Sequence, residues 1–128
     1  MALSSRLTGT LLCRAGEDRV AFVAHEVDTI ESPTTFGGRA GWANQRRAEA
    51  PAAHATGRIL VAGTGEAVGV DALEIDAEPL VLLPVPGLLA RVAGGSLRGF
   101  IQVRGALWPV MSLVDFGRFL APSAREAA

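Results

Sequence analysis

The sequence predicts a single, mainly β domain, and three features of the chain indicate it. Short apolar runs separated by glycine-containing turns occur in two blocks, at about 7–31 and 58–120. The segment 32–57 between them is rich in glycine and alanine and lacks the alternating pattern of a strand. The 128 residues suffice for one ordinary domain, which at this size buries about two-thirds of its unfolded surface.

The two blocks have the same order of elements. In the first block we expect a strand, a turn and a strand, at 7–14, 15–18 and 19–24. Val27 and Ile30 then continue the apolar face on a short turn or helix. In the second block the strand, turn and strand are expected at 58–62, 63–65 and 67–70, before Leu73 and Ile75. We interpret this order as an internal repeat that produces two related half-domains.

The middle segment, 32–57, differs from both blocks because it is long, irregular and locally positive. Loops of this length in a compact domain are uncommon and are usually functional or disordered. Residues 44–50 are expected to form a short helix that ends before Pro51. Trp42 has two open interpretations, as an exposed anchor for a partner or as a side chain that folds back onto the core.

Residues 98–113 carry the most informative pattern, RGFIQVRGALWPVMSL. It reads as Arg-Gly, four residues, Arg-Gly, three residues, Pro-Val, two residues and Leu. Gly99 and Gly105 provide the backbone freedom that turns and bulges need, and Pro109 marks an edge or bulge position. The apolar runs on either side of Gly105 favour β structure, so we predict a bent hairpin.

Two helices are expected around this hairpin. One lies at 86–93, where Pro86 suits the first turn and two glycines follow the end. The other begins after the hairpin, with Ser112 or Asp115 as its cap. Three apolar residues of that helix are expected to share one face: Phe116, Phe119 and Leu120. Residues 121–128 are expected to form a frayed tail.

Composition argues against several classes of protein. The net charge of −1 provides no basic field for nucleic acid. The single cysteine, Cys13, allows no intrachain disulfide and lies in an apolar run, so we expect a buried structural thiol and a reducing compartment. The longest apolar stretch, 79–90, is too short to span a bilayer and contains three prolines. We therefore expect a cytoplasmic protein without direct membrane insertion.

Residues that could carry chemistry do not form a recognised catalytic or metal motif. HExxH, CxxC, HxxxH and GxSxG are all absent from the sequence. His25 and Glu26 are neighbours at a strand end, where adjacent side chains point to opposite faces. The acidic residues between 71 and 78 are read as a solvated face rather than a metal site. We expect no enzyme activity, no cofactor and no metal, with Arg98 and Arg104 making turn caps or ion pairs at an interface.

The 98–113 pattern resembles the signature of CheW-like chemotaxis coupling proteins. Three further segments are similar to family patterns: 27–31 (VDTIE) to a V-x2-EI-like segment, 69–73 (GVDAL) to G-x-x-V-D-x-V, and 113–120 (LVDFGRFL) to the closing L-L-D-L-D-R-L-L. The resemblance covers most of 7–31 and 58–120. This chain looks like a short, divergent member similar to the CheW-like proteins of Frz-type gliding systems.

The resemblance implies a fold of two small SH3-like β-barrel subdomains with short helices. The chain departs from it because the family carries the full Arg-Gly pattern in its first half, where this chain has 32–57. Two alignments stay open. In the favoured one the first barrel is truncated; in the other the second block matches the family's first half. The favoured division of the single domain 1–128 is a reduced first half at 7–31, the irregular 32–57, a second half at 58–120 and a tail at 121–128.

The resemblance also implies a non-catalytic adaptor of a bacterial chemosensory array. The expected partners are the signalling domain of a chemoreceptor (a methyl-accepting chemotaxis protein) and other CheW-like proteins, with histidine-kinase binding weakened or lost. The expected partner-binding residues are Val27, Ile30, Glu31, Val70, Leu73, Leu82, Leu83, Arg98 and Arg104. For Val70 the competing interpretation, a core position, is favoured.

Three other functions stay open. One is an unrelated β-barrel interaction module. Another is a small enzyme that completes its site across a homodimer with His25 or Asp71. The third is nucleic-acid binding through Arg39, Arg46 and Arg47, which would be steeply salt-dependent.

Overall fold

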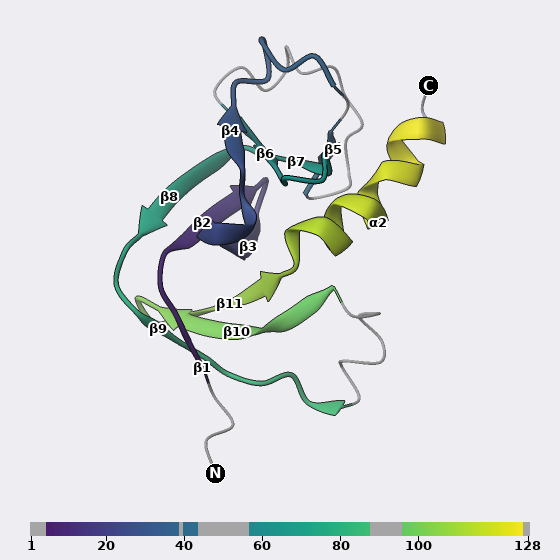
Figure 1. The fold of residues 1–128 in the computed structure, drawn as a ribbon. Helices are drawn as coiled ribbons and strands as arrows, with labels where there is room; N and C mark the ends of the chain where they lie inside the picture. The colour runs from purple at the N-terminus through teal and green to yellow at the C-terminus, as the bar shows by residue number, and fades with distance from the viewer. Residues whose placement is uncertain (1–4, 39, 44–56, 88–95, 127–128) are drawn as a thin grey trace.

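The computed structural model describes residues 5–38, 40–43, 57–87 and 96–126, and the fold is mainly β, as predicted (Figure 1). The strands form a five-stranded sheet, a four-stranded sheet and a two-stranded sheet. Helix α2 (Leu113–Glu126) packs against two strands of the four-stranded sheet, β5 (Gly41–Trp42) and β7 (Ala67–Val70).

The first half begins with a strand that is broken rather than continuous. In place of one strand over 7–14, the structure has β1 (Ser5–Leu7) and β2 (Thr10–Ala15). Gly9 lies between them with a φ of +80°, a conformation that favours glycine and lets the chain bend. Because of this bend, β1 pairs with β9 (Leu80–Leu82) while β2 enters the five-stranded sheet.

Each half contributes a hairpin, as the turn residues predict. In the first half β2 pairs with β3 (Asp18–Val23), and in the second β6 (Arg58–Val61) pairs with β7. The first hairpin is followed by a short 3-10 helix, η1 (Ala24–Glu26).

The next strand of each half crosses to the hairpin of the other half. From the first half, β4 (Thr29–Glu31) pairs antiparallel with β6, with Ile30 opposite Leu60. From the second half, β8 (Ala72–Asp76) pairs antiparallel with β2, with Leu73 opposite Cys13. The two sheets are therefore completed by an exchange of strands.

The strand orders of the two sheets are equivalent as a result. The five-stranded sheet has the order β10-β11-β3-β2-β8, and the four-stranded sheet has the order β4-β6-β7-β5. In each sheet the second hairpin strand also has a parallel neighbour, β11 (Ala106–Met111) on β3 and β5 on β7. The outermost strand β10 (Leu97–Val103) has no counterpart in the described part of the four-stranded sheet.

Two large clusters of buried side chains hold these sheets together, beside a third and smallest one of Trp42, Ile59 and Ala67. The larger cluster joins both halves and α2, because it contains residues of β2, β3, β6, β7 and the helix, among them Phe22, Leu60 and Phe116. The smaller cluster lies on the other face of the five-stranded sheet and contains Leu12, Ala21, Val23, Ile101, Val103, Trp108 and Val110. Alternate residues of β2 and β3 face different clusters, as the pleat requires.

The Arg-Gly pattern forms the predicted bent hairpin, β10–β11. Its two-residue turn has positive φ at Arg104 (+50°) and Gly105 (+78°), which is the pattern of a type I′ turn. A register shift between Leu97 and Gly99 bends the strand. Pro109 lies opposite Phe100 in a strand between two others, so the predicted edge position is wrong; β11 joins β3 through only one residue pair.

Gly99 is also the point where β10 approaches the segment after β9. Leu83 and Phe100 exchange backbone hydrogen bonds of 2.7 and 2.9 Å. A Cβ on Gly99 would collide with the backbone oxygen of Leu83. The bare backbone of Gly99 therefore permits the contact that connects β9 to β10.

The C-terminal helix begins as predicted but continues further. Ser112 caps it, since its hydroxyl accepts a hydrogen bond from the backbone N–H of Asp115 at 3.3 Å. The helix extends to Glu126, so a frayed tail from 121 is wrong. Phe119 stacks on Phe116, with ring centroids 6.3 Å apart, as a shared face predicts, but it is 57% exposed whereas Phe116 and Leu120 are buried. The helix expected at 44–50 lies outside the described residues, and that at 86–93 lies almost entirely outside them.

We expect Gly99→Ala to destabilise the protein by roughly 1–3 kcal/mol, because the added methyl group must push β9 away from β10. Denaturant unfolding measures the change in free energy. Gly63→Ala is the matched control, since its Cβ would meet nothing within 4 Å and its φ is not positive. Equal stability of the two variants would contradict the close approach at Gly99.

Burial raises the pKa of the Cys13 thiol from 9.0 to about 12. Between these values the unfolded chain has lost the proton while the folded chain retains it, so stability falls as pH rises through this window. We expect this decline to be shallower in Cys13→Ala. We also expect a thiol reagent to label Cys13 quickly only after denaturation, and rapid labelling of the native protein would contradict its burial.

Candidate functional site

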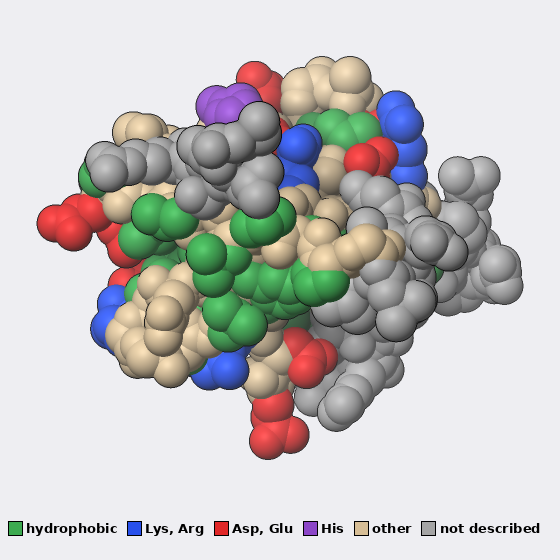
Figure 2. All heavy atoms as spheres, turned by 90° about the horizontal axis from the view of Figure 1, so that it is seen from below, with side chains coloured by type: hydrophobic (Ala, Val, Ile, Leu, Met, Phe, Trp, Pro, Cys, Tyr) green, Lys and Arg blue, Asp and Glu red, His purple; other side chains and the backbone are tan. Residues whose placement is uncertain are grey.

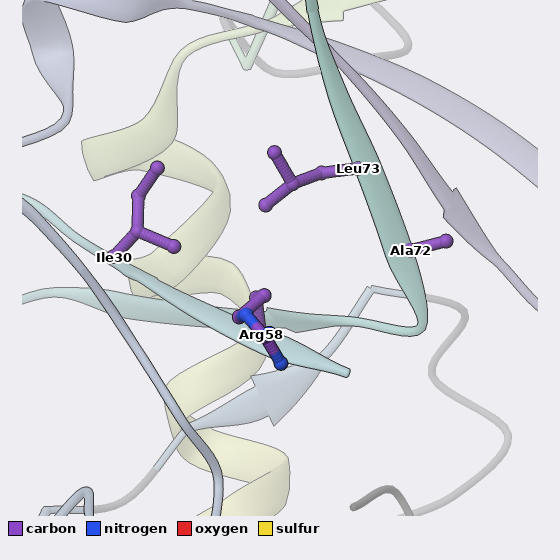
Figure 3. A pocket seen from close by; sticks show the side chains of 4 residues that line it. All are labelled: Ile30, Arg58, Ala72 and Leu73. Carbon is purple, nitrogen blue, oxygen red and sulfur yellow. The ribbon is translucent and has the colours of Figure 1, made fainter. Parts of the chain in front are cut away.

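An apolar groove lies where the exchanged strands β4 and β8 approach each other. It consists of two adjoining hollows of about 300 and 320 Å³ that share Ile30. The first is lined by Ile30, Arg58, Ala72 and Leu73. The second is lined by Leu11, Ala24, Val27, Asp28, Thr29, Ile30 and Ile75. Figure 3 shows the side chains of Ile30 and Leu73 extending toward each other across the first hollow, with Arg58 at one side.

The position of this groove follows from the strand exchange. Both β4 and β8 are edge strands. On one side, therefore, neither strand has a hydrogen-bonded neighbour in the described structure, and the groove lies at these open edges. Ile30 is 41% exposed and Ile75 is 63% exposed, while Val27 and Leu73 are partly buried against the larger core cluster. The groove therefore combines apolar side chains anchored in the core with two exposed isoleucines, and its lining also includes the polar residues Asp28, Thr29 and Arg58.

The structure brings three of the predicted partner-binding residues together. Val27, Ile30 and Leu73 all line the groove. Glu31 lies beside them on β4, where its carboxylate accepts a hydrogen bond from the Thr29 hydroxyl at 3.2 Å.

Val70 stands among the expected partner-binding residues, but its burial corrects that assignment and supports the favoured interpretation, a core position. Val70 is fully buried in the larger core cluster, because β7, a strand of the four-stranded sheet, packs against α2 and β2. Its apolar type is thus explained by packing alone.

Leu82 and Leu83 lie on another part of the molecule. They belong to β9 and the residue after it, which contact β1 and β10 rather than β4. Val81 and Leu83 are 47% and 41% exposed. Figure 2 shows hydrophobic side chains gathered near the middle of the face seen from below, the side on which β1 and β10 lie in Figure 1.

The two arginines of the Arg-Gly pattern make ion pairs of different character. Arg104 pairs with Glu74 at 2.6 Å, and both side chains are largely exposed. Arg98 pairs at 2.5 Å with Glu26, whose side chain is only 13% exposed. The other carboxylate oxygen of Glu26 accepts the backbone N–H of Leu113 at 3.0 Å. Glu26 therefore connects η1 of the first half to the hairpin and to the start of α2.

Sequence reasoning does not assign several of the groove residues to partner binding, among them Ile75 and Arg58. The place of Ile75 in the groove could be predicted from the repeat, because Ile75 is the last apolar position of the second repeat and corresponds to Ile30 in the first. The place of Arg58 in the groove could not be predicted, since an arginine at the start of a strand does not reveal which strand will pair beside it.

The residues considered above as catalytic groups or partner anchors are Asp71, Trp42 and His25. Asp71 and Trp42 make structural contacts, and His25 lies exposed on the surface. Both oxygens of Asp71 accept hydrogen bonds, from the Gly16 backbone N–H at 2.5 Å and the Trp42 indole N–H at 2.8 Å. Trp42 is 4% exposed, so it folds onto the protein rather than projecting from it. His25 is exposed at η1. Within the described ranges, no three His, Cys, Asp or Glu side chains are grouped to hold a metal ion.

Comparisons with known proteins identify no family. Neither a scan against protein-family models nor a search of curated proteins finds a match to this sequence. In the part of the chain that the structure describes, no helix has the length and apolar character needed to cross a bilayer.

The contacts of Glu26 lead to a prediction about stability, for which the exposed Glu74 is the control. We expect Glu26→Ala to lower the free energy of unfolding by about 1–3 kcal/mol, because it leaves the Leu113 N–H and the Arg98 guanidinium without their partner. Glu74→Ala should change stability by less than about 1 kcal/mol, since an exposed ion pair contributes little. Chemical denaturation of both variants tests this, and equal losses would contradict a special role for Glu26.

Proposed function

We propose that this protein is a short CheW-like adaptor that binds the signalling domain of a chemoreceptor through the apolar groove. The groove between the two halves is the observation that carries the proposal, because it gathers Val27, Ile30 and Leu73 at the junction of the exchanged strands. These residues come from the two segments, 27–31 and 69–73, that resemble the family patterns.

The arrangement of strands supports the proposed pair of small SH3-like barrels. Pairs of strands lead from β2 through β3, β11 and β10, and the Leu83–Phe100 bridge continues to β9, which follows β8 in the chain. Since β8 pairs with β2, the chain from β8 to β9 runs between the two ends of the five-stranded sheet, which supports a barrel-like arrangement. The equivalent order of the four-stranded sheet supports a second, related unit.

The short contribution of the first half after β4 supports weakened kinase binding. Where the second half has the long hairpin β10–β11, the described part of the first half has only the two-residue strand β5. In the family that this chain resembles, the first barrel makes most of the kinase contact. We therefore propose an adaptor that binds receptors and whose binding to the kinase is weakened or lost.

The groove suits an apolar stripe of a helical partner. Full burial of an aliphatic side chain contributes roughly 1.5–3 kcal/mol, so the two exposed isoleucines and their neighbours suffice for micromolar affinity after the entropy of association. A helix presents such a stripe at intervals of three and four residues.

The direct experiment measures the affinity of the purified protein for a chemoreceptor signalling domain and, separately, for the regulatory domain of a chemotaxis kinase. Binding to the receptor alone supports the proposal in full. Equal binding to both supports the adaptor but overturns the loss of kinase binding. Binding to neither overturns the coupling function and leaves an unrelated β-barrel interaction module.

We expect Ile30→Asp to weaken receptor binding about tenfold or more while the protein stays folded, because it places a charge in the apolar groove. Leu107→Asp is the matched control, since Leu107 is 51% exposed but lies on β11, away from the groove residues. Calorimetry measures the affinity and circular dichroism the folding. An unchanged affinity of the folded Ile30→Asp variant would exclude the groove as the receptor site.

A further inference from the structure

Two arginines lie directly opposite each other at the end of the first hairpin. Arg14 on β2 pairs with Arg19 on β3, next to the turn that joins the strands. Both side chains are exposed, and both guanidiniums lie over the ring of Trp108, at 5.3 and 5.8 Å from its centroid. Directly opposed like charges in an antiparallel pair are destabilising, so this arrangement calls for an explanation.

The pleat of the strands places both arginines on one face. Leu12 and Ala21 are two residues from Arg14 and Arg19 along their strands, and both belong to the smaller core cluster with Trp108. Side chains two residues apart in a strand point to the same side. Trp108 is only 3% exposed, so a rigid, buried indole supports two guanidiniums at the edge of this cluster.

Three other arginines in the described part of the chain have acidic partners, unlike Arg14 and Arg19. Arg98, Arg104 and Arg118 each form an ion pair with a glutamate. By contrast, within the described residues no carboxylate lies in ion-pair contact with Arg14 or Arg19, and their recorded contacts are with the Trp108 ring. The two unneutralised cations are held in place by stacking rather than by opposite charge.

We propose that Arg14 and Arg19, supported by Trp108, form a binding site for a carboxylate of an acidic segment in a partner protein. Planar guanidiniums match the geometry of carboxylates, and an ion bound between them removes the repulsion of the pair. Stacking on the indole fixes the two side chains before binding, which reduces the entropy lost on association.

The surrounding charges favour a singly charged ligand over a phosphate. Glu74 lies opposite Leu12, two residues along β2 from Arg14, and its partner Arg104 neutralises it. Glu17 and Asp18 lie in and beside the hairpin turn, close in sequence to both arginines. The carboxylates of Glu17 and Asp18 repel a doubly charged phosphate more strongly than they repel a single carboxylate.

The test follows the indole N–H signals of the full chain by nuclear magnetic resonance during titration with a hexaglutamate peptide at low ionic strength. We expect the Trp108 signal to shift and the Trp42 signal to stay, because Trp42 lies in the other sheet with its N–H bound to Asp71. A second titration uses inorganic phosphate. Absence of a Trp108 shift with the peptide overturns the site, and tighter binding of phosphate than of the peptide overturns the carboxylate assignment.

Charge-removing variants test the roles of the two arginines. Arg14→Gln and Arg19→Gln should each weaken peptide binding about tenfold or more, because each removes one of two charge-assisted contacts. Arg118→Gln is the matched control, since Arg118 is exposed and lies on α2. Peptide affinities of the two variants equal to that of the control overturn the proposal.

The site is independent of the proposed receptor groove. Ile30→Ser removes an apolar side chain of the groove without adding charge, so it should leave hexaglutamate binding unchanged. Loss of peptide binding in this folded variant would overturn a separate carboxylate site. Conversely, failure of receptor binding with intact peptide binding would overturn only the groove function.

Discussion

The exchange of strands between the two halves determines the rest of the structure. Neither hairpin is complete alone, because β2–β3 requires β8 and β6–β7 requires β4 as an antiparallel neighbour. The backbone groups at one edge of each hairpin are thus satisfied by the other half of the chain. The halves must consequently fold together, and the large core cluster that contains residues of both is the packing counterpart of this exchange.

The groove is a direct consequence of the same constraint. A strand that crosses from one unit to another ends at the edge of the sheet it joins, and here both crossing strands are edges. Their side chains that do not reach the core, above all Ile30 and Ile75, remain exposed where the units meet. This apolar surface therefore lies at the junction of the two sheets rather than on a broad sheet face.

Local signals predicted the hairpins, the capped helix and the mainly β class, because each depends on residues close together in sequence. The turn at Arg104 and Gly105 and the cap at Ser112 are of this kind. The partners of β4 and β8 could not be predicted, since Ile30 pairs with Leu60 and Leu73 with Cys13 across long separations. Without those partners, the buried Val70 and the exposed Ile30 look alike in the sequence. Helical periodicity places Phe119 on the face of Phe116 but does not fix how far a neighbouring sheet extends, so the exposure of Phe119 could not be predicted.

The groove and the arginine pair are separated by one strand. Arg14 lies opposite Ala72, and the next residue of β8 is Leu73 of the groove. An apolar groove provides affinity but fixes the direction of a bound helix only weakly, whereas a charged contact at one end discriminates between orientations. On the two proposals together, a partner with an acidic residue beyond its apolar stripe would engage both surfaces across β8. The exchanged strand would then do more than complete a sheet, since it would lie between the groove that provides affinity and the arginines of β2 and β3 that orient a single partner.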